Sequence, residues 1–152
     1  MAYTYLLKMT GISGESEIEQ HENEIEIDEF NEVFRNTDPL DELEKAELEK
    51  VRPYVHCSGL TIKKRFDHSI PNMLSCLTEG KRIKEATITC SGAENAQFLA
   101  VELSDVTVDE VRLDFKKEHS EITVNFSYNI IEYAALSGTE TKSQFRFKKT
   151  ND

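Results

Sequence analysis

Hydrophobic and polar positions follow two different periods along this chain, and the change of period is clearest between residues 60 and 90. In the middle of that stretch, apolar side chains are spaced three and four residues apart, which is the period of one helix face. Those side chains are Ile70, Met73, Leu74 and Leu77. Ser69 suits the N-terminal cap of this helix, and Gly80 suits a left-handed C-terminal cap. The pattern therefore predicts one short core helix over residues 69–79, with a strand on either side.

Most of the remaining chain alternates between apolar and polar residues, which is the period of a half-buried strand. The longest alternation covers residues 121–133. Its apolar positions are Ile122, Val124, Phe126, Tyr128 and Ile130. Further strands are predicted at 3–9, 54–66, 83–90, 98–103 and 106–115, and a last short one at Phe145 and Phe147. About eight strands and one core helix indicate a mainly β fold, a two-sheet β-barrel or sandwich, in which the helix covers a sheet edge or the barrel mouth.

A short alternation at residues 24–28 predicts a strand with one acidic side. Ile25 and Ile27 lie on the apolar side of this strand. The acidic side consists of Glu24, Glu26 and Asp28. The sequence therefore places three like charges next to one another on the surface.

A charged segment interrupts the strands at residues 31–55, where we predict an extended loop. Thr37 or Asp38 is a suitable cap for a second, charged helix over residues 38–50. This helix is too polar to lie in a core, so we expect it to be mobile or to face a partner. The whole chain, residues 1–152, is predicted to be one domain with a C-terminal tail at 134–152.

The net charge of −11 is unevenly distributed along the chain. Residues 1–60 hold 15 acidic and 5 basic residues, and the remainder holds 14 acidic and 13 basic residues. An acidic surface argues against nucleic acid as a partner. It is either a solvated surface or one that meets a basic patch on another copy or partner. The candidate basic residues are Lys63, Lys64, Arg65, Lys81 and Arg82.

Neither a membrane segment nor an active site is indicated by the sequence. No apolar run approaches the ~20 residues that span a bilayer, and the first residues do not resemble a signal peptide. The three cysteines are expected to be free, mostly buried thiols in a reducing compartment: Cys57, Cys76 and Cys90. The histidines have no metal-ligand spacing. We therefore predict no catalytic residue, no cofactor and no metal site.

Several of these motifs, taken in order, resemble the haemolysin-coregulated protein (Hcp) family, the tube subunit of bacterial type VI secretion systems. The first matching piece is Gly11-Ile-Ser-Gly-Glu-Ser16, followed by His21 and Glu24-Ile-Glu-Ile-Asp28. The second runs from Ile62-Lys-Lys-Arg-Phe-Asp67 through Ser69-Ile-Pro-Asn-Met-Leu to Gly80-Lys-Arg-Ile. The last two are Leu103-Ser-Asp-Val-Thr-Val108 and Val124-Asn-Phe-Ser-Tyr-Asn-Ile-Ile-Glu-Tyr133. Together they cover roughly residues 3–30 and 56–133, whereas the segment at 38–50 and the tail depart from the family pattern.

The resemblance implies a two-sheet barrel that assembles as six-subunit rings, which stack into a tube propelled from the bacterial cytoplasm without a signal peptide. It implies self-association, sheath and spike proteins as partners, and small effector proteins held in the lumen. The acidic residues 24–28 and the basic residues above are then candidates for a subunit interface or the lumen. The loop residues are candidates for ring stacking: Asp38, Leu40, Leu43 and Leu48.

Two other functions remain compatible with the sequence. The chain could be the tail-tube protein of a phage or another contractile injection device, which the sequence hardly separates from a secretion tube. It could instead be a monomeric β-barrel that binds a ligand or a single partner. The oligomeric state distinguishes the monomer from the tube subunits.

Overall fold

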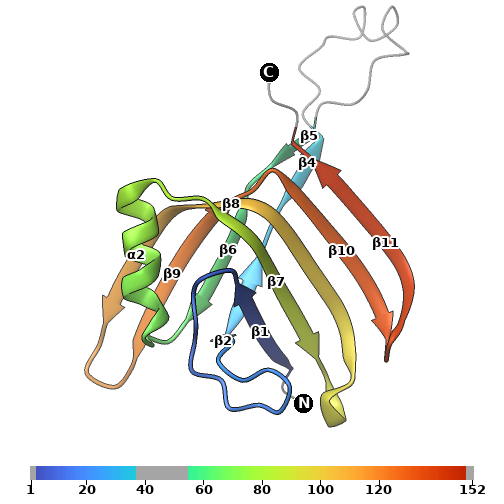
Figure 1. Cartoon of the computed structure of the whole chain (residues 1–152), viewed down its shortest axis with the longest axis horizontal. Helices are drawn as coiled ribbons and strands as arrows, with labels where there is room; N and C mark the ends of the chain where they lie inside the picture. Colours follow the sequence, from blue (N-terminus) through green and yellow to red (C-terminus); the bar gives the residue numbers. More distant parts are fainter. Residues whose placement is uncertain (1–2, 37–54, 150–152) are drawn as a thin grey trace, which may run out of the picture.

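The computed structural model describes residues 3–36 and 55–149, and within them the chain is mainly β with one α-helix (Figure 1). This confirms the predicted class and the predicted core helix. The described elements are β1 (Thr4–Met9), β2 (Ile25–Ile27), β3 (Glu29–Asn31), β4 (Phe34–Asn36), β5 (Val55–Cys57), β6 (Leu60–Lys64), α2 (Ser69–Glu79), β7 (Ile83–Ser91), the short 3-10 helix η1 (Ala93–Asn95), β8 (Gln97–Phe115), β9 (Ser120–Ser127), β10 (Ile130–Ser137) and β11 (Glu140–Lys148).

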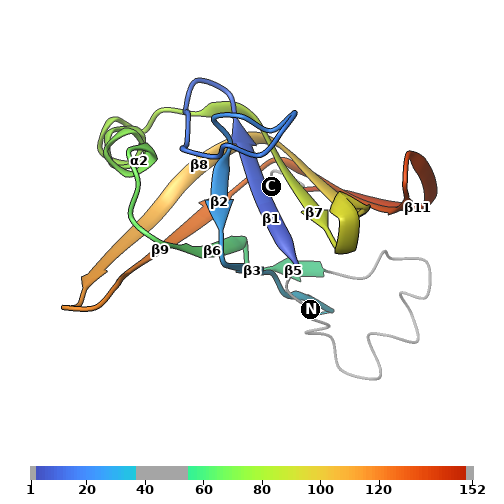
Figure 2. The same ribbon diagram turned by 90° about the horizontal axis from the view of Figure 1, so that it is seen from below.

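The strands form two antiparallel sheets that share β8. One sheet has the order β2-β1-β7-β8-β10-β11, and the other has the order β8-β9-β6-β3. The ribbon β4–β5 pairs only with itself among the described strands. Figure 2 shows the two sheets diverging from the bend of β8, with α2 lying against β8.

β8 is one strand of 19 residues, whereas the sequence predicted two strands that end and begin around residue 105. Asp105 has a left-handed backbone (φ +53), which an aspartate tolerates better than most residues. A bulge between Val108 and Glu110 bends the strand further. Hydrogen bonding continues through both irregularities, so β8 leaves one sheet and enters the other without ending.

The predicted long strand at 121–133 is instead two strands, β9 and β10, because it follows the bend of β8. β9 pairs with the second half of β8, and β10 pairs with the first half. Between them, the N–H of Asn129 donates to the carbonyl oxygen of Ser104 at 3.0 Å. The break changes the alternation: Tyr128 is buried as expected, but Ile131 replaces Ile130 as the next buried residue.

The helix α2 has the predicted bounds but a different N-terminal cap. Ser69 is the first helical residue, and the Asp67 carboxylate accepts hydrogen bonds from the Ser69 N–H at 2.9 Å and from its hydroxyl. Gly80 has the expected left-handed conformation (φ +65), and the N–H of Lys81 donates to the carbonyl oxygen of Cys76. The predicted apolar face is confirmed, since Ile70 and Met73 are fully buried.

The core lies between the two sheets and beneath α2. Its largest fully buried apolar side chains are Leu7, Ile25, Leu60, Ile62, Ile70, Met73, Ile88, Leu103, Ile122 and Phe126. The sheet is not closed into a barrel, so of the two predicted forms the closed barrel is wrong. The end strands β2 and β3 follow each other along the chain and are joined at Asp28, but they do not pair with each other.

The predicted tail is also part of the sheet. Residues that the sequence assigned to a tail from 134 onward complete β10 and form β11, a nine-residue strand that pairs with β10 along its length. Gly138 has φ +65 at the turn between them. The sequence predicted only a short strand here because most positions of β11 are polar and exposed.

All three cysteines are free and buried, as predicted. Burial raises the pKa of the Cys90 thiol to about 12, so this thiol stays protonated and unreactive at neutral pH.

Candidate assembly surface

The three acidic residues predicted to share one side of a strand have different surroundings. The Glu24 side chain is largely buried, and its Oε2 lies 2.8 Å from Nδ1 of His21. Glu26 on β2 and Asp28 after it are exposed. Of the three residues, Glu26 and Asp28 therefore present carboxylates to solvent, whereas Glu24 forms part of a turn.

The first group of predicted basic residues is split between surface and core. Lys63 is partly exposed and its Nζ lies 3.7 Å from Oε1 of Glu29, while Arg65 is exposed. Lys64 is only 1% exposed, and its Nζ lies 2.9 Å from Oδ2 of Asp67. Lys64 also donates to the carbonyl oxygen of Arg65 at 2.7 Å. Its charge is used inside the subunit and does not contribute to an exposed basic surface.

The second group, Lys81 and Arg82, follows α2 and is exposed. Both residues line a surface depression of about 300 Å³ together with the exposed side of α2 and the turn after β1. This depression holds basic side chains at one end and Glu79 among its lining residues. The predicted loop residues lie outside the described residues: Asp38, Leu40, Leu43 and Leu48.

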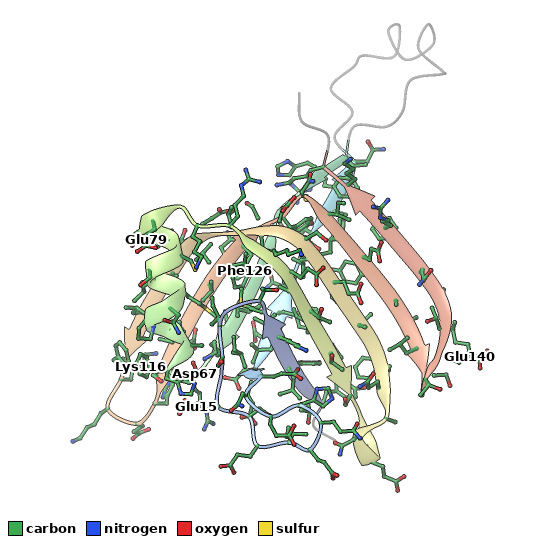
Figure 3. The ribbon with its side chains drawn as sticks, viewed as in Figure 1. Glu15, Asp67, Glu79, Lys116, Phe126 and Glu140 are labelled. Atoms are coloured by element: carbon green, nitrogen blue, oxygen red, sulfur yellow. The ribbon has the colours of Figure 1, made fainter. Side chains whose placement is uncertain are left out.

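Besides the three-residue end strands β2 and β3, two long strand edges are unpaired within the described part of the chain. The second half of β8, Thr107–Phe115, pairs with β9 on one side and with no described strand on the other. β11 pairs with β10 on one side only. Figures 1 and 2 both place the β8–β9 hairpin tip and β11 at opposite ends of the molecule. Lys116 and Glu140 mark these two ends in Figure 3.

Exposed aromatic residues lie beside each unpaired edge. At the β8–β9 end, Phe66 and Phe115 are 48% and 61% exposed, and their ring centroids lie 5.8 Å apart. Leu113 adds a third exposed apolar side chain there. At the β11 end, Phe145 is half-exposed and contacts Phe34 of the ribbon with a centroid distance of 5.6 Å. Exposed apolar groups next to unpaired backbone are typical of interaction sites.

The charges along the two edges have opposite signs. Residues 107–115 of β8 contain Asp109, Glu110 and Asp114 but only one basic residue, Arg112. β11 contains three basic residues and one acidic residue: Lys142, Arg146, Lys148 and Glu140. Part of the charge on β11 is satisfied within the subunit, since Arg146 Nε lies 2.9 Å from Oε1 of Glu132.

A cluster of polar groups connects the ribbon to β10. The Glu32 carboxylate accepts hydrogen bonds from the hydroxyls of Tyr128 and Tyr133, and the Tyr128 hydroxyl also lies 3.1 Å from Sγ of Cys57. Burial raises the pKa of Glu32, while the two hydroxyl donors and Lys149 oppose this shift. We call Glu32, Tyr128, Tyr133 and Cys57 the Glu32 cluster.

The sequence did not reveal the edges or the Glu32 cluster. Tyr128 and Tyr133 are an odd number of residues apart, so an unbroken strand would place them on opposite faces. The break at Asn129 reverses the alternation and brings both hydroxyls to the same carboxylate. The sequence signal that could have indicated this break is Asn129 after Tyr128, because asparagine is common where a strand is interrupted.

The described residues include neither a group of metal ligands nor a helix that could span a membrane. In residues 3–36 and 55–149, no three His, Cys, Asp or Glu side chains are grouped so that they could hold a metal ion. In the same ranges, no helix is long and apolar enough to cross a membrane.

Comparison with known proteins gives a consistent result. A family model described as "Type VI secretion system effector, Hcp" matches residues 6–134. No curated protein matches the chain in sequence. The fold is shared with several solved structures.

Hcp1 from Salmonella typhimurium superposes with a TM-score of 0.82 at 23% identity, over 97% of this chain and 95% of that chain. A type VI secretion system effector from Yersinia pestis gives a TM-score of 0.76 at 19% identity, over 95% and 99% of the two chains. Hcp2 from Salmonella typhimurium gives a TM-score of 0.73 at 18% identity, over 95% of each chain.

Proposed function

The chain belongs to the Hcp family of type VI secretion systems, and from this premise we propose that it is a structural tube subunit that assembles into closed rings. The resemblance in sequence leads us to expect six subunits in each ring. The role is structural rather than catalytic. Rings of this kind stack into a tube that is propelled from the bacterial cytoplasm and does not need a signal peptide.

The observation that carries this proposal is the pair of long unpaired edges, β11 and the second half of β8, at opposite ends of one subunit. β11 has nine residues, and the unpaired stretch Thr107–Phe115 of β8 is equally long. An edge strand left unpaired exposes backbone donors and acceptors to uncontrolled aggregation. A head-to-tail contact between β11 of one copy and β8 of the next would pair both edges and, with a suitable rotation, close a ring.

Charge and apolar surface favour the same contact. The edge of β8 carries a formal excess of acidic residues, and β11 carries an excess of basic residues. Opposite charges across an interface select the register and accelerate association. Phe66 and Phe115 at one end and Phe145 at the other would be covered in such a contact.

The remaining parts of the proposal concern the lumen and the partners. We propose that Glu26 and Asp28, together with Glu24, lie near a neighbouring subunit or the lumen. Of the basic residues predicted from the sequence, Arg65, Lys81 and Arg82 are exposed and Lys63 is partly exposed, so these four are available for sheath, spike, effector or ring contacts. If reversing the charges of Glu26 and Asp28 leaves assembly and its salt dependence unchanged, this assignment is wrong.

The proposal is tested by the mass of the purified full-length protein, measured by light scattering on a sizing column, with negative-stain images of the peak. We expect a closed ring. A monomer that persists at high concentration would contradict the tube subunit and favour a monomeric binding protein.

Charge exchange between the edges tests which surfaces close the ring. The variant Lys142→Glu/Lys148→Glu should abolish rings, and so should Glu110→Lys/Asp114→Lys, because each brings like charges together. Combining all four substitutions restores the original net charge and should restore rings. Mixing the two double variants should also restore them, since each then offers a complementary edge to the other. Rings that persist in both double variants would show that other surfaces close the ring.

A further inference from the structure

The ribbon β4–β5 has little structure of its own to fix its position. Its two strands have three residues each and pair only with each other among the described strands. An isolated two-stranded ribbon is marginally stable at best. At its base, the Ser58 N–H donates to the carbonyl oxygen of Val33, and the Ser58 hydroxyl accepts from the Val33 N–H. These bonds join the two strands but do not attach the ribbon to either sheet.

The Glu32 cluster attaches the base of the ribbon to the β10–β11 hairpin. Glu32 lies between β3 and β4, two residues before the ribbon, and its Oε1 accepts a hydrogen bond of 2.6 Å from the Tyr133 hydroxyl on β10. Its Oε2 accepts from the Tyr128 hydroxyl, which also contacts Cys57 at the end of β5. The cluster therefore joins both strands of the ribbon to the segment that leads into β10.

An aromatic contact supports the same attachment. The Phe34 ring, on β4, meets the rings of Tyr133, Phe145 and Phe147 edge-on, with centroid distances of 6.1, 5.6 and 5.7 Å. Edge-to-face pairs at these distances are favourable. Phe34 is nevertheless partly exposed, so the aromatic contact alone leaves water at the seam.

We propose that Glu32 is a positioning residue that holds the β4–β5 ribbon against the β10–β11 hairpin through the hydroxyls of Tyr128 and Tyr133. The carboxylate is the central element because, among the described residues, it is the group that accepts hydrogen bonds from both tyrosines. Its two oxygens let one side chain hydrogen-bond both hydroxyls, in the charged and in the neutral form. The position of the ribbon against the hairpin then depends on this side chain together with the Phe34 contacts.

The chemistry of the cluster makes this attachment respond to pH. The titratable or charged groups that face Glu32 are Tyr128, Tyr133, Cys57 and Lys149, with Cys90 close to Tyr133. Burial and the neighbouring carboxylate raise the pKa of both tyrosines, so both hydroxyls keep their protons at any usable pH. Glu32 is then the group whose change of protonation can alter the hydrogen bonds to the two tyrosines.

The pH dependence of the attachment follows from the direction in which burial shifts the pKa of Glu32. Burial raises its pKa above the ordinary value of 4.5, so the attached ribbon binds the proton more tightly than the detached ribbon. Attachment is therefore strongest below pH 4.5 and weakens as the pH rises through the raised pKa. Neutral Glu32 can donate to the Tyr128 oxygen while the Tyr128 hydroxyl turns toward Cys57, so the cluster stays hydrogen-bonded in both states.

Hydrogen–deuterium exchange of the full-length protein tests the proposal. In Glu32→Ala, we expect exchange of the amides at 34–36 and 55–57 to accelerate by about tenfold or more, the equivalent of losing one charge-assisted hydrogen bond. The central strands β7 and β8 should exchange as in the wild type. Equal exchange of the ribbon amides in Glu32→Ala and the wild type would overturn the proposal.

The conservative variant separates positioning from general stability. Glu32→Gln retains a donor and an acceptor for the two tyrosines, so it should restore much of the protection. It cannot titrate, so protection corrected for intrinsic exchange should no longer fall as the pH rises above 4.5, whereas the wild type loses protection as the pH passes the raised pKa of Glu32. A pH profile that is the same in Glu32→Gln as in the wild type would overturn the role of the carboxylate.

Glu29→Gln is the matched control, because it makes the same substitution close to the ribbon, on β3. The Glu29 side chain is exposed, and its Oε1 lies 3.7 Å from Nζ of Lys63, so it forms at most a weak surface ion pair. It should leave ribbon exchange and its pH profile unchanged. The measurement is made within one subunit, so it does not depend on ring formation and can succeed or fail independently of the proposed assembly.

Discussion

The two ends of the molecule carry the same features, an unpaired strand edge and a group of aromatic rings, but only one end uses its aromatic rings to hold the fold together. At the β11 end, Phe34 covers Tyr133, Phe145 and Phe147, and the Glu32 cluster joins the ribbon to the hairpin. At the β8–β9 end, Phe66 and Phe115 contact mainly each other and remain exposed. Phe66 and Phe115 therefore contribute little to the stability of the subunit itself, and their exposed rings favour a contact with a partner.

The polar groups near each end differ in the same way. Near the β8–β9 end, Lys64 and Asp67 form a buried ion pair that caps α2. At the β11 end, a carboxylate is held by neutral hydroxyls. A buried full charge requires its partner far more strictly than a half-buried carboxylate that retains access to water. We therefore expect substitution of Lys64 to lower the stability of the whole subunit, and substitutions in the Glu32 cluster to have smaller effects that are confined to the ribbon.

The largest effect is expected for Lys64→Ala. Removing the buried ammonium leaves Asp67 without its counter-ion beneath α2, and breaking such a pair typically costs about 3–5 kcal/mol. Urea denaturation measures this as a fall in the free energy of unfolding. Lys63→Ala, at the neighbouring position where the side chain reaches solvent, should stay within about 0.5 kcal/mol of the wild type. Equal losses in the two variants would show that the buried pair is not specifically important.

The second largest effect is expected at Gly59, which connects the ribbon strand β5 to β6. Its backbone is left-handed (φ +81), and a Cβ there would lie 2.7 Å from the carbonyl oxygen of Phe126. Gly59→Ala should therefore cost about 2–3 kcal/mol, because strain and a steric clash act together. Gly138 is the control, since it is also left-handed (φ +65) but has nothing within 4 Å. Gly138→Ala should cost only about 1 kcal/mol, and a larger loss at Gly138 than at Gly59 would refute this explanation.

A smaller and more local effect is expected for Tyr133→Phe. The variant keeps the ring that packs on Phe34 but removes one hydrogen bond to Glu32, worth about 1.5 kcal/mol when the acceptor is charged. The loss should be confined to the ribbon amides in hydrogen exchange. Tyr3→Phe is the control, because Tyr3 is 59% exposed, and it should have almost no effect. Uniform acceleration of exchange over both sheets would contradict a local role.

The contrast between the ends also explains what the sequence could predict. Periodicity identified α2 and the buried sides of β2 and β9, because each of these elements packs one face against the core. It failed where hydrogen bonding overrides the local pattern: β8 continues through Asp105, and the strand after it is broken at Asn129. Alternation cannot show a change of sheet, because a strand that changes sheets still looks like one strand or two short ones.

The surfaces were harder to predict than the fold for a different physical reason. Charge alone selected Lys64 together with Lys63 and Arg65, yet alternation along β6 turns Lys64 into the core and its neighbours outward. Glu32 stands in a polar run and has no sequence feature that distinguishes it from the neighbouring acids. Its role depends on residues about 100 positions away, which only the folded chain brings together.

The smallest effect on stability is expected at the exposed aromatic pair, where Phe66→Ser/Phe115→Ser should leave the free energy of unfolding of the subunit within about 1 kcal/mol, since both rings are already largely in water. If the β8 edge meets β11 of another copy, the same variant should nevertheless weaken ring formation, because it removes apolar area from that contact. Phe145→Ser provides the comparison: it should lower both ring formation and ribbon protection, since Phe145 also packs on Phe34. Sedimentation velocity over a concentration series measures assembly, and denaturation under dissociating conditions measures the subunit. A Phe66/Phe115 variant that destabilises the subunit as much as Phe145→Ser would show that both ends hold the fold together, whereas one that assembles normally would remove the β8–β9 end from the interface.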